Sequence, residues 1–206
     1  MVLRLTRAVG ILLAAVLLAA CADEMVQFRN FRDPLIERLP SAQAVTIFRF
    51  ADVRGEEGDH GNPLLVGAMY NGVGMKTAKV MTATPWPESL VQQLSNGFAQ
   101  RGVQTSAVAD RVYVPGATAV STPLVLGGEI QNFSTEARWR DLWAHVSGTI
   151  RLYDRQGALR FQKPLEVRVR SVEAQSLEAI LNSAVHQFVR AVVTDPELTR
   201  QLTASQ

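Results

Sequence analysis

The sequence predicts an α+β fold in which two amphipathic helices pack on one face of a mostly antiparallel sheet. The first observation is a C-terminal segment whose apolar residues recur at helical spacing over four turns. The second is a strand of alternating apolar and polar residues that leads through a short turn into another strand. The third is the order of the elements, β, loop, α, β, β, β, β, α, which suits one sheet covered by two helices.

The first predicted strand covers residues 44–53. The run AVTIFRFADV is apolar at nearly every position and rich in β-branched and aromatic residues, which is typical of a strand covered on both faces. We therefore expect it to lie centrally in the sheet. Residues 54–74 hold six glycines and predict a long loop with a short strand around residues 64–69. Loops of this length are commonly mobile or functional.

A helix is predicted to begin at Pro87 and to end at Arg101 and Gly102, because proline is favoured in the first helical turn and glycine just after the last. Strands are predicted at residues 103–109 and 124–133. The apolar face of this helix consists of Leu90, Val91, Leu94 and Phe98.

The clearest hairpin joins residues 144–153 to residues 159–169 through the turn 154–157. Pro164 predicts a bulge or an edge position in the second strand. The last helix then ends near Asp195. Its apolar stripe consists of Leu177, Ile180, Leu181, Ala184, Val185, Phe188, Val189 and Val192.

The N-terminus has the parts of a secretory signal peptide: Arg4 and Arg7, an apolar run, and small residues that end at Cys21. The run is too short for a comfortable membrane span. Leu18-Ala19-Ala20-Cys21 resembles the lipobox of bacterial lipoproteins, which implies lipidation of the Cys21 sulfur and a mature chain that starts there. The alternative is an ordinary signal peptide with a free cysteine, which an oxidising compartment disfavours.

The expected domain organisation follows from this motif. Residues 1–20 are a lipoprotein signal peptide, residues 21–40 are the lipidated N-terminus and a polar, proline-punctuated tether, and residues 41–200 are a single α+β periplasmic domain. Removal of residues 1–20 leaves 19 basic and 19 acidic residues. A neutral chain without a basic cluster gives no case for a nucleic-acid partner.

No catalytic residue, cofactor site or metal site is expected. The glycine-rich residues 67–77 resemble a phosphate loop, but Val73 stands where the lysine is needed. His60, His145 and His186 are far apart in the sequence, and none has metal-ligand spacing. A Gly-x-Ser-x-Gly nucleophile motif is absent from the sequence. We therefore expect a protein that is not an enzyme, with an envelope hydrolase as a minority alternative.

A candidate partner interface consists of Arg138, Trp139, Arg140 and Trp143, because tryptophan and arginine are enriched at binding hot spots. The alternative is a packed rim in which arginine stacks on tryptophan. A further group of arginines is expected on the polar face of two paired strands, with glutamates as counter-charges. These residues are Arg151, Arg168, Arg170, Glu129 and Glu166.

Asp52-Val53-Arg54 after the first strand, the glycine loop and the helix that ends at Arg101 and Gly102 resemble the YajG-type lipoproteins of Gram-negative bacteria. The later half, with Leu126-Gly127-Gly128-Glu129-Ile130 and the turn Tyr153-Asp154-Arg155-Gln156-Gly157, is also similar to auxiliary lipoproteins of envelope ABC transporters. Both resemblances imply a membrane-attached envelope protein that works through partners. We expect Asp52 and Arg54 to form a loop-fixing ion pair.

The function expected from these observations is that of a lipid-anchored, non-catalytic envelope lipoprotein that acts through a protein partner in envelope assembly or maintenance. The alternative is an auxiliary component of an ABC-type lipid or solute transport system. Where lipoproteins are sorted, an aspartate directly after the lipidated cysteine acts as a retention signal. Ala22 stands at that position instead, which implies the outer membrane, with the domain facing the periplasm.

Overall fold

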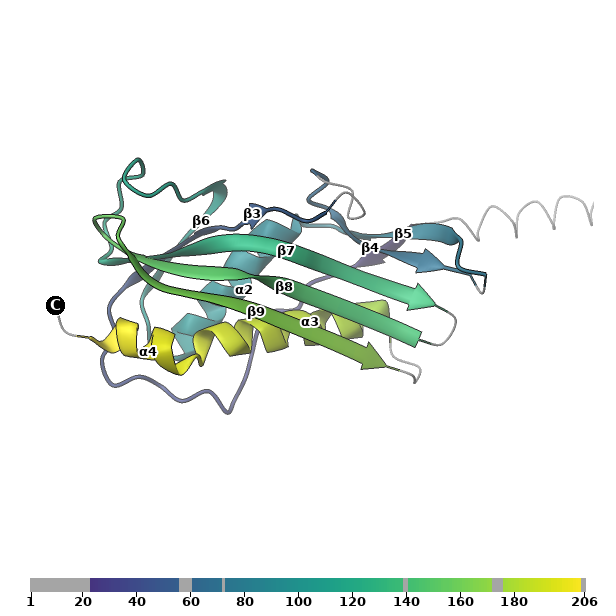
Figure 1. Cartoon of the computed structure of the whole chain (residues 1–206). Coiled ribbons are helices and arrows are strands. Elements are labelled where there is room, and N and C mark those ends of the chain that lie inside the picture. Colours follow the sequence, from purple (N-terminus) through teal and green to yellow (C-terminus); the bar gives the residue numbers. More distant parts are fainter. Residues whose placement is uncertain (1–22, 56–60, 72, 139–140, 172–175, 205–206) are drawn as a thin grey trace, which may run out of the picture.

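The computed structural model describes residues 23–55, 61–71, 73–138, 141–171 and 176–204. Over these residues the chain forms one mixed sheet of nine strands with three helices beside it (Figure 1). The expected α+β class is confirmed. Cys21, His60, Trp139 and Arg140 lie outside the described residues.

Strand β7 (Leu124–Arg138) is the long strand on which the sheet is built. One side of β7 pairs antiparallel with β8 (Asp141–Asp154), which pairs antiparallel with β9 (Leu159–Ser171). The predicted hairpin is therefore confirmed. Pro164 lies in β9, which pairs with β8 alone and is therefore an edge strand. A proline has no N–H, but no strand on the outer side of β9 requires that donor.

Two groups of strands share the other side of β7. The first half of β7 pairs in parallel with β2 (Val45–Arg49) and β3 (Ala51–Asp52), and the second half pairs in parallel with β4 (Leu65–Tyr70). Strand β6 (Thr105–Val112) lies beside β2. Strand β5 (Lys76–Thr82) lies beside β4, and β1 (Glu24–Val26) lies beside β5.

The sheet is mixed, so the expected mostly antiparallel arrangement is only partly right. Strand β2 runs parallel to both of its neighbours, as expected for a strand that is buried on both faces. Ile47 lies in the main core, and Phe48 packs against Tyr113 on the opposite face with ring centroids 5.2 Å apart. Apolar patterning shows which face of a strand is covered, but it does not show the direction of the neighbouring strand.

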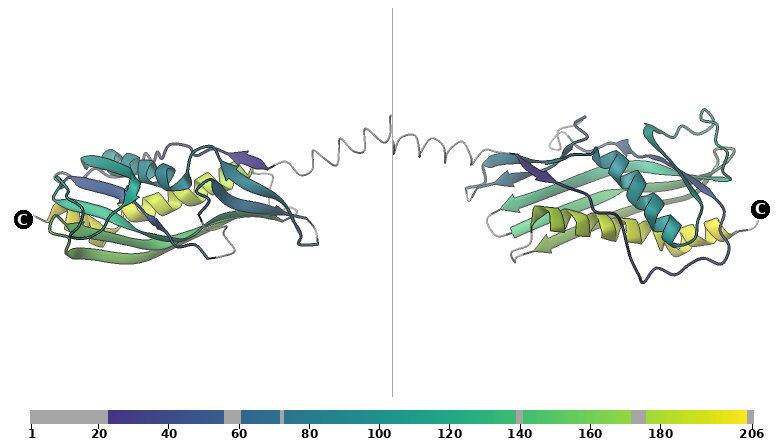
Figure 2. Two further views of the ribbon diagram at one scale, coloured as in Figure 1. Left: turned by 90° about the horizontal axis from the view of Figure 1, so that it is seen from above. Right: turned by 180° about the vertical axis from the view of Figure 1, so that it is seen from behind.

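Three helices lie among the described residues: α2 (Trp86–Gln100), α3 (Leu177–Val193) and α4 (Pro196–Thr203). Helices α2 and α3 cover one face of the sheet (Figure 2). These are the two predicted helices. The other face of β7, β8 and β9 is open except near the start of β7, where Val125 is buried with Phe48 and Tyr113. Helix α4 was not predicted, because a proline after Asp195 ends one helix and also suits the first turn of the next. Asp195 caps α4 by accepting a hydrogen bond from the Leu198 N–H.

The glycine-rich region contains more regular structure than expected. The short strand predicted around residues 64–69 is confirmed as β4, but β5 follows it directly and completes an unpredicted hairpin. Gly67 lies where β4 passes close to β7, since a Cβ there would stand 1.9 Å from the Thr135 carbonyl oxygen.

The N-terminal segment differs from the expected tether. Residues 24–26 form β1 at the edge of the sheet, and Phe31 is buried in the core. Phe28 meets Phe133 edge-on with ring centroids 5.9 Å apart. The Leu39 N–H donates to the Arg101 carbonyl at 2.8 Å. The described part of this segment therefore belongs to the folded domain and does not act as a free linker.

The edge of β7 has a gap between its two groups of partner strands. Strand β3 pairs as far as Ile130, and the pairing of β4 begins at Thr135. Arg54 fills this gap and is only 3% exposed. Its Nη1 donates to the carbonyl of Leu65 at 2.9 Å and to that of Phe133 at 3.3 Å. A side chain thus supplies hydrogen bonds that a continuous strand would supply.

Asp52 orients the Arg54 guanidinium through two parallel hydrogen bonds. Arg54 Nε donates to Asp52 Oδ1 and Nη2 donates to Asp52 Oδ2, both at 2.9 Å. The guanidinium also lies over the Trp86 ring, 4.8 Å from its centroid. The expected ion pair between Asp52 and Arg54 is confirmed, and it fixes two sheet segments as well as a loop.

We expect Arg54→Met to lower the free energy of unfolding by about 3–5 kcal/mol, because it leaves a half-buried carboxylate and two carbonyls without their partner. Arg54→Lys should be nearly as costly, since an ammonium cannot make the bidentate contact. The matched control is Arg190→Met, which removes an exposed arginine from Asp33 and should cost less than about 1 kcal/mol. Urea denaturation measures all three variants. Equal costs for Arg54→Met and Arg190→Met would contradict this role.

Candidate functional site

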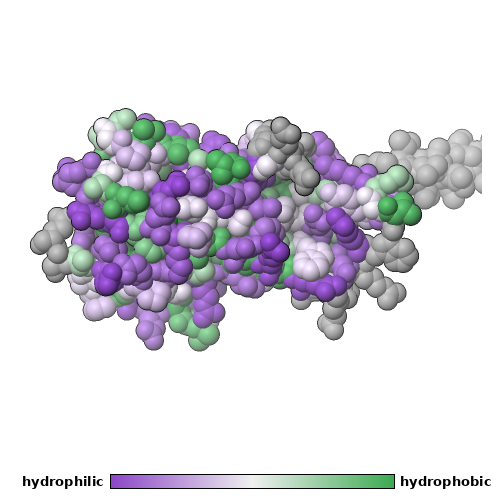
Figure 3. Space-filling model, in the orientation of Figure 1, coloured by the Kyte–Doolittle hydropathy of each residue, from purple (hydrophilic) through white to green (hydrophobic). Residues whose placement is uncertain are grey.

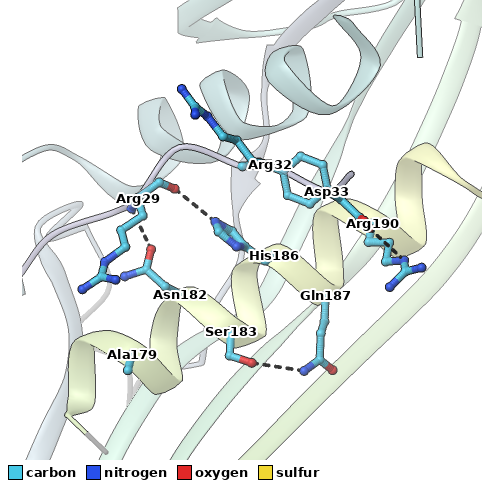
Figure 4. Close-up of a pocket in the computed structure, with 10 residues that line it drawn as sticks. Arg29, Arg32, Asp33, Ala179, Asn182, Ser183, His186, Gln187 and Arg190 are labelled. Carbon is cyan, nitrogen blue, oxygen red and sulfur yellow. Dashed lines mark hydrogen bonds and ion pairs between the residues drawn. The ribbon is translucent and has the colours of Figure 1, made fainter. Parts of the chain in front are cut away.

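A cleft of about 450 Å³ lies between the N-terminal segment and helix α3 (Figure 4). One wall is the extended chain at residues 29–33, and the other is the exposed side of α3. The cleft is lined by Arg29, Phe31, Arg32, Asp33, Ala179, Asn182, Ser183, His186, Gln187 and Arg190. Four of these side chains are basic or can become so, which makes the cleft a candidate site for an anionic ligand.

Asn182 binds the N-terminal segment from the middle of α3. It is 4% exposed, its Oδ1 accepts a hydrogen bond from the Arg29 N–H at 2.7 Å, and its Nδ2 donates to the Gln27 carbonyl at 2.8 Å. His186 Nε2 lies 3.1 Å from the Arg29 carbonyl oxygen, and the Phe31 ring packs edge-on against the imidazole. The amide of one buried side chain therefore replaces strand pairing for this part of the chain.

Helix α2 holds the same segment from its other side. Gln100 Oε1 accepts from the Asp33 N–H and Gln100 Nε2 donates to the Phe31 carbonyl, both at 2.9 Å. Gln93 Nε2 donates to the Arg29 carbonyl at 2.6 Å. A second hollow of about 710 Å³ lies on this side and shares Phe31, Arg32 and Asp33 with the cleft.

Two ion pairs close the cleft at its ends. Arg29 Nη2 lies 3.0 Å from Glu178 Oε1, and Arg190 Nε lies 3.1 Å from Asp33 Oδ2. Both arginines are largely exposed, so each pair contributes no more than about 1 kcal/mol. The two cations already have carboxylate partners, and this weakens the case for a bound anion.

The cleft does not present an activated nucleophile. Ser183 Oγ accepts a hydrogen bond from Gln187 Nε2 at 3.2 Å, and an amide cannot remove a hydroxyl proton. Within the described part of the chain, no group of three or more His, Cys, Asp or Glu side chains could hold a metal ion. The geometry instead fastens a chain segment to two helices.

The sequence did not reveal the residues that hydrogen-bond the N-terminal segment to the two helices. His186 is considered there only as a metal ligand, and no role is assigned to Asn182, Gln93 or Gln100. Asn182 directly follows Leu181 of the apolar stripe, and Gln93 directly precedes Leu94. A polar residue inside an apolar helical stripe signals a buried hydrogen bond, and this was the available clue.

The predicted Arg and Trp cluster lies on the open face at one end of the sheet. Strand β8 presents Trp143, which is 38% exposed, and the Arg170 guanidinium covers its ring at 4.7 Å. Arg138 ends β7 and lies 4.9 Å from the Tyr70 ring centroid. Arg170 also bonds Asp141 Oδ2 at 3.0 Å. The structure brings Arg138 and Trp143 to the same end of the sheet, and the other two predicted residues lie outside the described range.

The rest of the open face is polar and charge-paired. Arg151 contacts Glu129 at 3.2 Å and Arg168 contacts Glu166 at 2.6 Å, so the expected counter-charges are confirmed. His145 lies beside the second pair, opposite Arg168 in the sheet and with its Nε2 3.0 Å from Glu166 Oε1. Burial and then the nearby Arg168 lower the pKa of His145, which keeps its imidazole neutral at pH 7. Figure 3 shows this face as mainly hydrophilic.

No family model matches this sequence, and no curated protein does. Several solved structures are similar. A Xanthomonas campestris protein of family DUF330 is 12% identical with a TM-score of 0.59, over 87% of this chain and 97% of that chain. An uncharacterized protein is 12% identical with a TM-score of 0.49, over 82% and 97%. Lipoprotein GNA1162 from Neisseria meningitidis is 16% identical with a TM-score of 0.34, over 74% and 99%.

These comparisons establish a fold shared with the Xanthomonas protein. The other two structures have TM-scores below 0.5 and do not extend this conclusion. Among the helices that the structure describes, none has both the length and the apolar character needed to cross a membrane.

We expect Asn182→Ala to release the N-terminal segment from α3, because it leaves the Arg29 N–H and the Gln27 carbonyl without their partner. Loss of a buried hydrogen-bond partner costs about 1–3 kcal/mol, so trypsin should cut after Arg29 and Arg32 about tenfold faster. Mass spectrometry of timed digests measures the cleavage. The control is Ser183→Ala, one residue along the helix, which should digest like the wild type. Equal rates for both variants would show that other contacts hold the segment.

Proposed function

We propose that this chain is a lipid-anchored, non-catalytic lipoprotein of the bacterial cell envelope that acts through a protein partner. The observation that carries the proposal is the motif Leu18-Ala19-Ala20-Cys21, which stands two residues before the first described residue of a folded domain. The chain holds no second cysteine for pairing. The sulfur of Cys21 is therefore assigned the diacylglyceryl group.

The anchor also sets where the domain works. Two or more acyl chains give stable membrane attachment without help from the protein. Ala22 supports placement in the outer membrane, with the domain in the periplasm. The resemblance to YajG-type lipoproteins supports the same class of function.

The cluster of Trp143, Arg170, Arg138 and Tyr70 is the surface that we assign to the partner. An indole ring that is already covered by a guanidinium loses little side-chain freedom on binding, and tryptophan and arginine dominate binding hot spots. The charge-paired face beside the cluster suits the polar rim of an interface. The partner would therefore meet a compact aromatic and cationic site and not a broad apolar face.

We expect Cys21→Ser to abolish lipid attachment, since only the sulfur can take the acyl glycerol. In cells fed a labelled fatty acid, the wild type should be labelled and sediment with membranes, and the variant should be unlabelled or unprocessed. The matched control is Ala22→Asp, which should keep the label and shift the protein to the inner membrane. A wild type that takes no label and leaves the membrane in plain buffer would show that the chain is not a lipoprotein.

We expect a photo-crosslinking residue at position 143 to capture an envelope protein in cells, and the same residue at the exposed position 131 to capture none. A permease or a substrate-binding protein would favour a role in transport, and another outer-membrane component would favour assembly. Trp143→Ala should weaken the complex by about 2 kcal/mol or more with the fold intact. No crosslink from position 143 or 139, together with a Trp143→Ala variant that is merely less stable, would make the cluster a packing feature.

A further inference from the structure

The tip of the β4–β5 hairpin exposes two large apolar side chains, which are separated in the sequence by Gly74. Val73 is 79% exposed and Met75 is 62% exposed. Figure 3 shows an apolar patch at this end of the molecule, next to the grey atoms. Apolar side chains gathered at a projecting tip are typical of a contact surface and not of a packed turn.

The described N–H groups of the tip are hydrogen-bonded within the tip. Asn71 Oδ1 accepts from the N–H groups of Val73 at 3.1 Å and Met75 at 2.9 Å. The Asn71 N–H donates to the Met75 carbonyl at 2.9 Å, and the Gly74 N–H donates to the Asn71 carbonyl at 3.0 Å. A turn with few free N–H groups can enter a poorly hydrated environment at low cost, and the side chains of Val73 and Met75 remain available for contact.

The pairing of β1 with β5 places the start of β1 toward the same end of the sheet as this tip. The two strands are parallel, with Glu24 opposite Val80, so the chain enters β1 from the side on which β5 begins. Asp23 Oδ1 accepts from the Lys79 N–H at 3.0 Å. Lys79 lies four strand residues, or about 13 Å, from Met75.

The chain between the anchor and this point is very short. Cys21 stands two residues before Asp23, and two extended residues span at most about 7 Å. An acylated Cys21 lies at the membrane surface, so the start of β1 must lie there as well. The β4–β5 tip then lies within reach of the same surface, at the end of the sheet where Figure 1 shows β4 and β5.

We propose that the β4–β5 tip, through Val73 and Met75, is a second membrane contact that inserts into the headgroup region of the bilayer holding the acyl chains of Cys21. The proposal rests on the proposed lipid anchor. The two contacts together hold the domain in one orientation, with the carboxyl end of β7 toward the lipid. Without the anchor, two side chains give too little apolar burial for stable binding.

The test uses the full acylated protein, purified with its lipid and reconstituted into vesicles of phosphatidylethanolamine and phosphatidylglycerol. An environment-sensitive fluorophore is attached to a cysteine introduced by Met75→Cys; it reacts there alone because Cys21 is the only native cysteine and is acylated. Nitroxide-labelled lipids should quench this probe roughly twofold or more relative to the control.

The control is Val114→Cys, an exposed apolar position in the loop after β6, at the opposite end of the sheet (Figure 1). Its probe should be quenched by aqueous iodide and not by the lipid nitroxides. If the protein is acylated and membrane-bound but the probe at position 75 behaves like that at position 114, the hairpin contact is overturned and the anchor stands. If mass spectrometry finds no acyl group on the wild type, the anchor and the contact are both overturned.

Discussion

The structure depends on the guanidinium of Arg54, which stands where the edge of β7 passes from one set of partner strands to another. A buried arginine is costly unless its donors are satisfied. Here Asp52 takes two of them, and the carbonyls of Leu65 and Phe133 take others. Because Leu65 begins β4, this side chain joins the start of the β4–β5 hairpin to β7 just before the pairing of β4 with β7 begins. The position of the hairpin tip, and of β1 beside it, follows from these two contacts together.

The second constraint is the N-terminal segment, which both covering helices hold. A free coil of about 20 residues would let the domain wander roughly 25 Å from its anchor. Instead, Asn182 from α3 and Gln100 from α2 bind the backbone of residues 29–33. Strand β1 pairs with β5 from Glu24 onward, so only two residues separate Cys21 from the sheet. With the lipid anchor that we propose at Cys21, so short a spacing would make the orientation of the domain at the membrane depend on the fold.

The sequence predicted the elements whose patterns are long and regular, and it missed those that depend on partners. The stripe of α3 and the alternation of β8 each repeat many times, so both were placed correctly. Residues 23–40 show no period because side chains of two helices hold them in an extended form. Their apolar contacts, among them Phe28, Phe31 and Leu39, are irregularly spaced. Strand direction was also out of reach, since no residue pattern encodes whether β4 runs parallel to β7.

The candidate sites also differ in whether the sequence alone predicts them. The ion pair of Asp52 and Arg54 was predictable because both residues lie close together in the sequence. The approach of Arg170 to Trp143 depends on the register of β8 and β9, which alternation alone leaves open. The cleft beside α3 was not predictable, because its walls are about 150 residues apart in the chain.

The register of β4 against β7 relates the proposed partner cluster to the proposed membrane contact. Tyr70 ends β4 opposite Arg138, and the apolar hairpin tip begins at the next residue. The cluster and the tip therefore occupy neighbouring positions at one end of the sheet. If the tip lies in the headgroup region as we propose, a partner docked on Trp143 must itself reach to within a few residues' length of the bilayer. This geometry favours a partner that is also held in or on that membrane over one that diffuses freely in the periplasm.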